Sequence, residues 1–212
     1  MKLKGIKANF LGDSITEGVG VSSVEYAYLN VLKKNFELAE ARNYGISGTR
    51  IARQHTPTPN RPRMDLDFCQ RVDEMDPDAE LVVVFGGTND FGHGDAPMGS
   101  FADRTPDTFY GACHYLMTRL IERFPQATIV FMTPLHREFE QRAGVPDLSE
   151  YVNVIIEVAR YYGIPVMDLY ANSGLAPSVP IIKQTYVPDG LHPNNAGAAR
   201  VAERLGAFLT AL

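Results

Sequence analysis

Short apolar segments alternate with longer segments of helical periodicity along the chain. Two of the apolar segments, LVVVF at 81–85 and TIVFM at 128–132, consist almost entirely of β-branched and large apolar residues. Such runs are typical of strands that are covered on both faces. With three further segments of similar length, the pattern predicts strands at 6–11, 39–44, 81–85, 128–133 and 165–168.

The segments between the strands have the pattern of amphipathic helices. Pro106 next to a threonine indicates the start of one helix, and Gly163 with Pro165 indicates the end of another. We therefore predict helices at 25–36, 105–124 and 148–162. A C-terminal helix shows the clearest buried stripe, with apolar residues three and four positions apart at Ala198, Val201, Ala202, Leu205, Phe208 and Leu209.

Alternation of strands and helices predicts parallel strands joined by right-handed crossovers, and hence an α/β fold of the three-layer α/β/α type. Five strands favour the flavodoxin-like order 2-1-3-4-5. The 212 residues suit a single domain, 1–212. Segment 53–76 is long, polar and proline-rich, which predicts either a lid over a site or a surface excursion.

The composition limits the classes of binding partner that we expect. Hydrophobic residues make up 45% and charged residues 21% of the chain, and the formal charge of −5 comes from interspersed acids and bases. Without a basic stripe we expect no nucleic-acid partner, and without a cationic amphipathic helix or an apolar run near ~18 residues we expect no stable membrane association. The absence of an apolar leader, and of ligand spacing around Cys69 and Cys113, predicts a cytoplasmic protein with free thiols. The sequence leaves the oligomeric state open.

Four polar clusters follow predicted strands or precede the last helix. They are GDS at 12–14, NYGISG at 43–48, GGTND at 86–90 and DGLHPNN at 189–195. Parallel strands bring such segments to one edge of the sheet, where ligands bind in open α/β folds. Acyl transfer needs a nucleophile, a base, a group that orients the base and donors for the oxyanion. The clusters contain one candidate of each kind.

The roles follow from side-chain chemistry. Ser14, at a strand-to-helix turn, is the candidate nucleophile, and its backbone N–H is a candidate oxyanion donor. His192 would take the hydroxyl proton and later deliver it to the leaving alcohol, while Asp189 would hold the imidazole in the right tautomer. The side-chain amide of Asn89 is a second, neutral oxyanion donor.

These motifs, in this order, resemble the SGNH hydrolases, also called GDSL-type lipases and esterases. The resemblance covers residue 6 to the end, with Ile15 where the family name has leucine. It implies the three-layer fold and hydrolysis of carboxylic esters by a serine, with no metal and no organic cofactor. It also implies that the backbone N–H of Gly48 joins the oxyanion hole, where a residue without Cβ lets substrate approach closely.

Several residues keep a second interpretation. Ser14 alone would pass for a helix cap, and Asp13 and Asp90 are candidates for bracing loops. His93 ends a second Asp-x-x-His sequence and could line the site; we prefer His192, whose flanks fit a turn before a helix. Arg53, with Arg61 and Arg63, fits a solvated loop face or a contact with a polar or anionic substrate.

The function predicted is a serine esterase that cleaves short acyl groups, for example acetyl, from a small polar or carbohydrate substrate. The segments 53–76 and 136–147, which are placed to cover the site, are polar and lack an apolar lid. Within the family, a lysophospholipase or a thioesterase is the alternative. Outside it, the glycine-rich GDSITEGVG suggests a flavodoxin-like mononucleotide-binding protein, but Asp13 and Glu17 would repel a phosphate there and no P-loop lysine follows.

Overall fold

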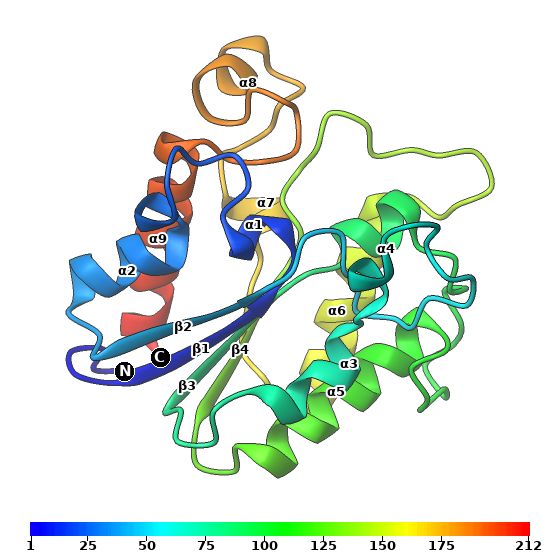
Figure 1. The fold of residues 1–212 in the computed structure, drawn as a ribbon, viewed down its shortest axis with the longest axis horizontal. Coiled ribbons are helices and arrows are strands. Elements are labelled where there is room, and N and C mark those ends of the chain that lie inside the picture. Colours follow the sequence, from blue (N-terminus) through cyan, green and yellow to red (C-terminus); the bar gives the residue numbers. More distant parts are fainter.

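A five-stranded parallel sheet lies between two layers of helices in the computed structural model, which describes residues 1–212 (Figure 1). The strand order is β2-β1-β3-β4-β5, and every neighbouring pair is parallel. This confirms the predicted fold class and strand order. The strands are β1 (Lys7–Gly12), β2 (Glu40–Gly45), β3 (Leu81–Phe85), β4 (Thr128–Met132) and β5 (Val166–Met167).

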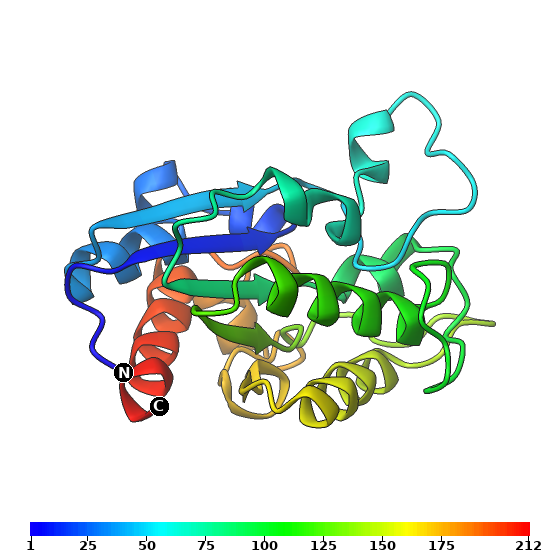
Figure 2. The same cartoon turned by 90° about the horizontal axis from the view of Figure 1, so that it is seen from below.

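Two groups of helices cover the faces of the sheet (Figures 1 and 2). Helices α2 (Tyr28–Phe36) and α9 (Asn195–Ala211) pack on one face, and α3 (Phe68–Arg71), α5 (Phe109–Arg123) and α6 (Leu148–Tyr162) on the other. None of the helices has the length and apolar composition needed to cross a bilayer. The remaining short helices are α1 (Ser14–Glu17), η1 (Val24–Tyr26), η2 (Pro62–Asp65), η3 (Val72–Glu74), α4 (Thr88–His93), α7 (Leu169–Asn172) and α8 (Pro180–Tyr186).

The central strand β3 shows why its sequence is continuously apolar. Val82 and Val84 point into the core under α5 and α6, whereas Leu81, Val83 and Phe85 point into the core under α2 and α9. Because alternate residues of a strand face opposite sides, a strand between two helical layers buries every residue. All five residues of β3 are buried.

Helix α5 begins four residues later than predicted. The hydroxyl of Thr108 accepts a hydrogen bond from the backbone N–H of Gly111 at 3.1 Å, so Thr108 is the N-cap and Phe109 the first helical residue. Pro106 lies before the helix, where its carbonyl accepts from the backbone N–H of Arg53 at 2.8 Å. Proline next to threonine therefore marks a turn here, because the side chain of Thr108 supplies the stronger cap.

Segment 53–76 is only partly a surface excursion. Phe68, Cys69, Val72 and Met75 are buried in the core under α5, so the second half of the segment belongs to the folded layer. The first half, up to η2, projects beyond the carboxyl edge of the sheet (Figure 2). The two halves differ in sequence, because apolar residues at helical spacing occur only after residue 67.

The carboxyl ends of the central strands are level with one another. Gly12 of β1 is aligned with Gly45 of β2 and with Phe85 of β3, which is aligned in turn with Met132 of β4. The loops that carry the polar clusters therefore leave the sheet side by side. Buried Arg71 joins two of these ends by donating to the carbonyls of Gly12 at 3.1 Å and Tyr44 at 2.6 Å.

Candidate active site

Ser14 is the first residue of α1, and only Asp13 separates it from the end of β1 at Gly12. The carboxylate of Asp13 accepts a hydrogen bond from the backbone N–H of Ile15 at 3.0 Å and so caps the helix. Glycine is required at position 12, because a Cβ there would lie 2.0 Å from the hydroxyl oxygen of Thr16. Close packing of α1 on the strand end therefore fixes where the Ser14 side chain points.

The structure brings Ser14, His192 and Asp189 into one hydrogen-bonded row. The hydroxyl oxygen of Ser14 lies 2.9 Å from Nε2 of His192, and Nδ1 of the same ring lies 2.7 Å from a carboxylate oxygen of Asp189. A carboxylate can only accept, so the proton of the neutral ring belongs on Nδ1. Nε2 is then an acceptor for the Ser14 hydroxyl, which is the arrangement that a general base requires.

The turn that holds Asp189 and His192 is fixed at both ends. The second carboxylate oxygen of Asp189 accepts from the backbone N–H groups of Leu191 at 2.9 Å and His192 at 2.7 Å. Beyond the turn, Asn194 caps α9, and Asn195 forms two hydrogen bonds with Ser22 in the loop after α1. The segment that follows Ser14 is thus tied to the segment that follows His192.

Asp189 is a carboxylate whose charge is supported locally. Partial burial alone would raise its pKa, but hydrogen bonds from the backbone of His192, the imidazole of His192 and the backbone of Leu191 outweigh burial and lower the pKa below its usual value. Asp189 is therefore ionised at neutral pH and can stabilise a protonated imidazole.

Three N–H donors lie around the Ser14 loop. Neither the backbone N–H of Ser14 nor that of Gly48 has an acceptor within the protein. The side-chain amide of Asn89 donates to the carbonyl of Thr49 at 2.9 Å, which fixes the amide next to the Gly48 loop and leaves its second N–H free. The loop is joined to α1 by Glu17, whose carboxylate accepts from the backbone N–H of Ser47 at 2.7 Å.

The structure gives a backbone reason for glycine at position 48. Its φ is +79°, and a Cβ at this position would lie 2.5 Å from the terminal methyl of Met64. The space that a Cβ would take is thus occupied by the protein's own Met64, while the close approach of substrate to the Gly48 N–H stays a prediction. The positive φ disfavours any larger residue, and the contact would in addition require the Met64 side chain to move.

Asp90 braces the same loop from the other side. Its two carboxylate oxygens accept from the backbone N–H groups of Ile51 at 3.0 Å and Ala52 at 2.8 Å. Burial raises the pKa of Asp90 to about 6, although these backbone hydrogen bonds act in the opposite direction. Asn89 and Asp90 of α4 therefore both hold residues 49–52 in place.

His93 and Arg53 have other partners. Nδ1 of His93 lies 2.9 Å from the guanidinium of Arg50, and partial shielding from water, followed by the charge of Arg50, lowers its pKa to about 4. The second Asp-x-x-His sequence thus forms no Asp–His pair, because Asp90 is occupied by backbone donors. The guanidinium of Arg53 pairs with Asp107 at 3.4 Å and lies 3.9 Å from Asp67.

Sequence reasoning missed the residues that hold the loops. Arg50 is buried and donates to the carbonyl of Met64 at 2.9 Å and to Asp65 at 2.8 Å, which fixes the 62–65 turn against Gly48. In the sequence, only their closeness to site residues could have indicated this role. Arg50 follows Gly48 by two residues, and Glu17 follows Ser14 by three. No three His, Cys, Asp or Glu side chains are grouped so as to hold a metal ion.

Comparison with known proteins gives one family and many related folds. The model of the GDSL-like Lipase/Acylhydrolase family matches residues 10–200. No curated protein matches the sequence. One solved structure is 34% identical over 100% of this chain and 99% of its own, with a TM-score of 0.87.

Two further structures have similar coverage. A protein from Lactobacillus plantarum is 30% identical over 98% of both chains, with a TM-score of 0.86. The lipase/acylhydrolase from Enterococcus faecalis is 23% identical over 97% of this chain and 94% of its own, with a TM-score of 0.65, and this second likeness concerns the fold.

The buried carboxyl of Asp13 predicts a specific pH dependence of stability. Burial raises its pKa to about 7, so between about pH 4 and pH 7 the folded protein retains a proton that the unfolded chain releases. The contribution of the Asp13 carboxyl to the free energy of unfolding is complete below its pKa in the unfolded chain, and it is lost as the pH rises through the pKa in the folded protein. The variant Asp13→Asn keeps a capping oxygen but cannot titrate, so it should gain stability relative to wild type by up to about 4 kcal/mol between pH 4 and pH 8.

Urea unfolding at a series of pH values measures this difference. Asp147→Asn, the same change at the N-cap of α6, controls for the exchange of a capping carboxylate. A difference between Asp13→Asn and wild type that stays constant from pH 4 to pH 8 would show that Asp13 does not titrate in this range.

Proposed function

The chain belongs to the GDSL-like lipase/acylhydrolase family, and from this premise we propose that it is a serine esterase that removes short acyl groups from a polar alcohol through an acyl-enzyme on Ser14. The observation that supports this proposal most strongly is the row of hydrogen bonds from Ser14 through His192 to Asp189, at 2.9 Å and 2.7 Å. Nucleophile, base and orienting carboxylate are already aligned without a change of conformation.

In the first half of the reaction, the Ser14 oxygen attacks the ester carbonyl carbon while its proton passes to Nε2 of His192. The carbonyl oxygen gains negative charge and accepts hydrogen bonds from the backbone N–H groups of Ser14 and Gly48 and from the amide of Asn89. When the tetrahedral intermediate breaks down, the bond to the alcohol oxygen is cleaved and Nε2 donates its proton to that oxygen. The alcohol leaves, and the acyl group remains on Ser14.

In the second half, water replaces the alcohol. His192 takes one proton from the water as the water oxygen attacks the acyl carbonyl, and the same donors hold the oxyanion. Breakdown returns the proton to the Ser14 oxygen and releases the acid. Asp189 keeps its charge throughout and stabilises the imidazolium that forms in each half.

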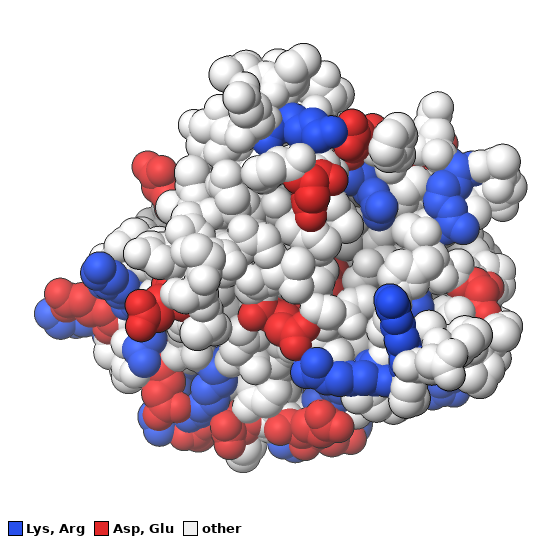
Figure 3. All heavy atoms as spheres, turned by 45° about the horizontal axis from the view of Figure 1, so that its top comes forward, with Lys and Arg blue, Asp and Glu red and all other residues white.

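The preference for short acyl groups is inferred from the surroundings of Ser14. The loop 136–147 and the projecting part of 53–76 carry mostly polar side chains, and on the face shown in Figure 3 acidic and basic groups are interspersed with uncharged atoms. A long acyl chain needs a continuous apolar wall to be favourable. Phosphate binding is not favoured, because the carboxylate of Glu17 lies at the turn after β1.

Substitution of each candidate base tests the proposed mechanism. Ser14→Ala and His192→Ala should each lower kcat for p-nitrophenyl acetate at least ~10³-fold, because nucleophile and base act as a unit. His93→Ala should stay within about tenfold of wild type, since His93 contacts Arg50 instead of Ser14. Loss of turnover in His93→Ala with near wild-type turnover in His192→Ala would reverse the assignment, and circular dichroism spectra control for folding.

A series of p-nitrophenyl esters tests the acyl preference. We expect kcat/KM to be highest for acetate or propionate and to fall steadily toward octanoate, because the polar surroundings do not compensate for ordering a long chain. Equal or rising kcat/KM at eight carbons would instead favour the lysophospholipase or thioesterase alternative. Measurements below the critical micelle concentration keep micelles from affecting the comparison.

A further inference from the structure

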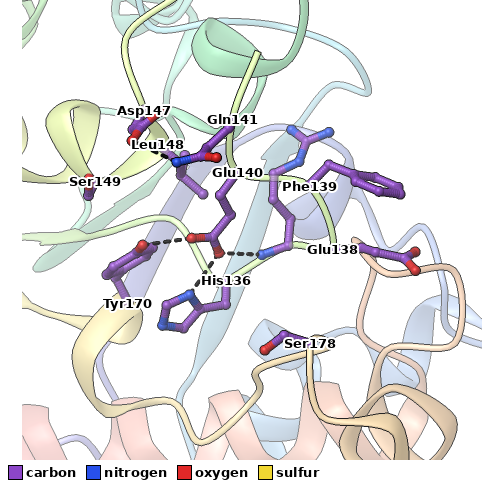
Figure 4. A pocket seen from close by; sticks show the side chains of 11 residues that line it. His136, Glu138, Phe139, Glu140, Gln141, Asp147, Leu148, Ser149, Tyr170 and Ser178 are labelled. Carbon is purple, nitrogen blue, oxygen red and sulfur yellow. Dashed lines mark hydrogen bonds and ion pairs between the residues drawn. The ribbon is translucent and has the colours of Figure 1, made fainter.

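A polar cavity lies beside the catalytic turn and is not used by the mechanism described so far. Its volume is about 660 Å³, within the range of small-molecule sites. The wall consists of residues 136–141 after β4, residues 147–149 at the start of α6, and Tyr170 and Ser178 from the segment between β5 and α8 (Figure 4). Three separate chain segments thus converge on it.

Three side chains form a rigid floor (Figure 4). One carboxylate oxygen of Glu140 lies 2.7 Å from Nδ1 of His136, and the other accepts from the hydroxyl of Tyr170 at 2.7 Å. The rings of His136 and Tyr170 lie against each other, with centroids 3.9 Å apart. Because Nδ1 carries the proton toward Glu140, Nε2 of the neutral ring is left as a fixed acceptor.

Other groups around the cavity are free to bind a ligand. The hydroxyls of Ser149 and Ser178 form no hydrogen bond within the protein, and the side-chain carbonyl of Gln141 has no donor. Phe139 at the rim is 73% exposed, more than any other large hydrophobic side chain of the chain. Donors, acceptors and an aromatic face together suit a ligand with several hydroxyls and an apolar C–H face.

The charges of the cavity favour a neutral ligand. Glu138 pairs with Lys183 at 2.6 Å, Glu140 is bonded as described above, and Asp147 caps α6. Each of these carboxylates already has partners within the protein, which a cationic ligand would have to displace. With Glu138 compensated by Lys183, Glu140 and Asp147 still outnumber the single guanidinium of Arg137, so an anion is disfavoured.

The cavity adjoins the turn that bears His192. The backbone N–H of Glu138 donates to the carbonyl of Gly190 at 2.8 Å, and Gly190 is the residue after Asp189. His192 must reach the oxygen of the leaving alcohol in order to protonate it, so the alcohol half of an ester lies on this side of Ser14. The carbonyl oxygen would instead face the N–H groups of Gly48 and Asn89.

We propose that this cavity binds the alcohol half of the substrate, and that this alcohol is a neutral polyhydroxy compound such as a sugar. The inference rests on the proposed esterase function and specifies its substrate class. Phe139 would pack against the C–H face of the sugar ring, and Ser178, Ser149 and His136 would bind its hydroxyls.

Steady-state kinetics on two acetate esters test the proposal. For an acetylated methyl glycoside, Phe139→Ala and Ser178→Trp should each raise KM at least tenfold with little change in kcat, because one removes the stacking face and the other fills the cavity. For p-nitrophenyl acetate, which has no hydroxylated alcohol, both variants should stay within twofold of wild type. Ile181→Ala, at a 63% exposed hydrophobic residue of α8 outside the cavity wall, is the matched control and should change neither substrate.

The outcomes separate the two levels of inference. If the variants alter the glycoside ester less than twofold, or if wild type hydrolyses p-nitrophenyl acetate but not the glycoside ester, the sugar subsite is wrong while the esterase stands. If wild type hydrolyses neither ester, the proposed function fails and the subsite with it. Competitive inhibition of p-nitrophenyl acetate hydrolysis by the free methyl glycoside, lost in Ser178→Trp, would support binding independently of turnover.

Discussion

The parallel alignment of the strand ends is the constraint on which the candidate site depends. Gly12, Gly45 and Phe85 are paired across β2, β1 and β3, so the loops that carry Ser14, Gly48 and Asn89 begin at the same height. No local propensity could place these residues together, because they are separated by dozens of positions in sequence. The buried apolar faces of the sheet determine the register of the strands, and this register determines where the loops with the site residues begin.

Buried polar contacts then turn nearby loops into a defined geometry. Arg71 joins the ends of β1 and β2, Asp90 holds the backbone at 51–52, and Asn195 ties α9 to the loop that follows α1. Each contact satisfies backbone groups that helices and strands leave open. Burial of these charged groups has a cost, visible in the raised pKa of Asp90, which the hydrogen bonds only partly offset.

The sequence was sufficient for the strands, their order and the row from Ser14 to Asp189, because these follow from burial on both faces and from short motifs at strand ends. It did not predict features that depend on contacts between residues far apart in the sequence. The start of α5 depends on the Thr108 cap, and the need for glycine at position 48 arises from its positive φ in a loop against which Met64 packs. Arg50 and the floor formed by His136 and Glu140 gave no signal, since each depends on tertiary partners that spacing does not reveal.

In the proposed mechanism, Ser14 is the one serine whose oxygen is activated for attack on an ester carbonyl. Mass spectrometry of the protein after reaction with a fluorophosphonate measures this directly. We expect a single adduct, on the peptide that contains Ser14, and none in His192→Ala under the same conditions. An adduct on another residue, or none on the wild-type protein, would contradict it.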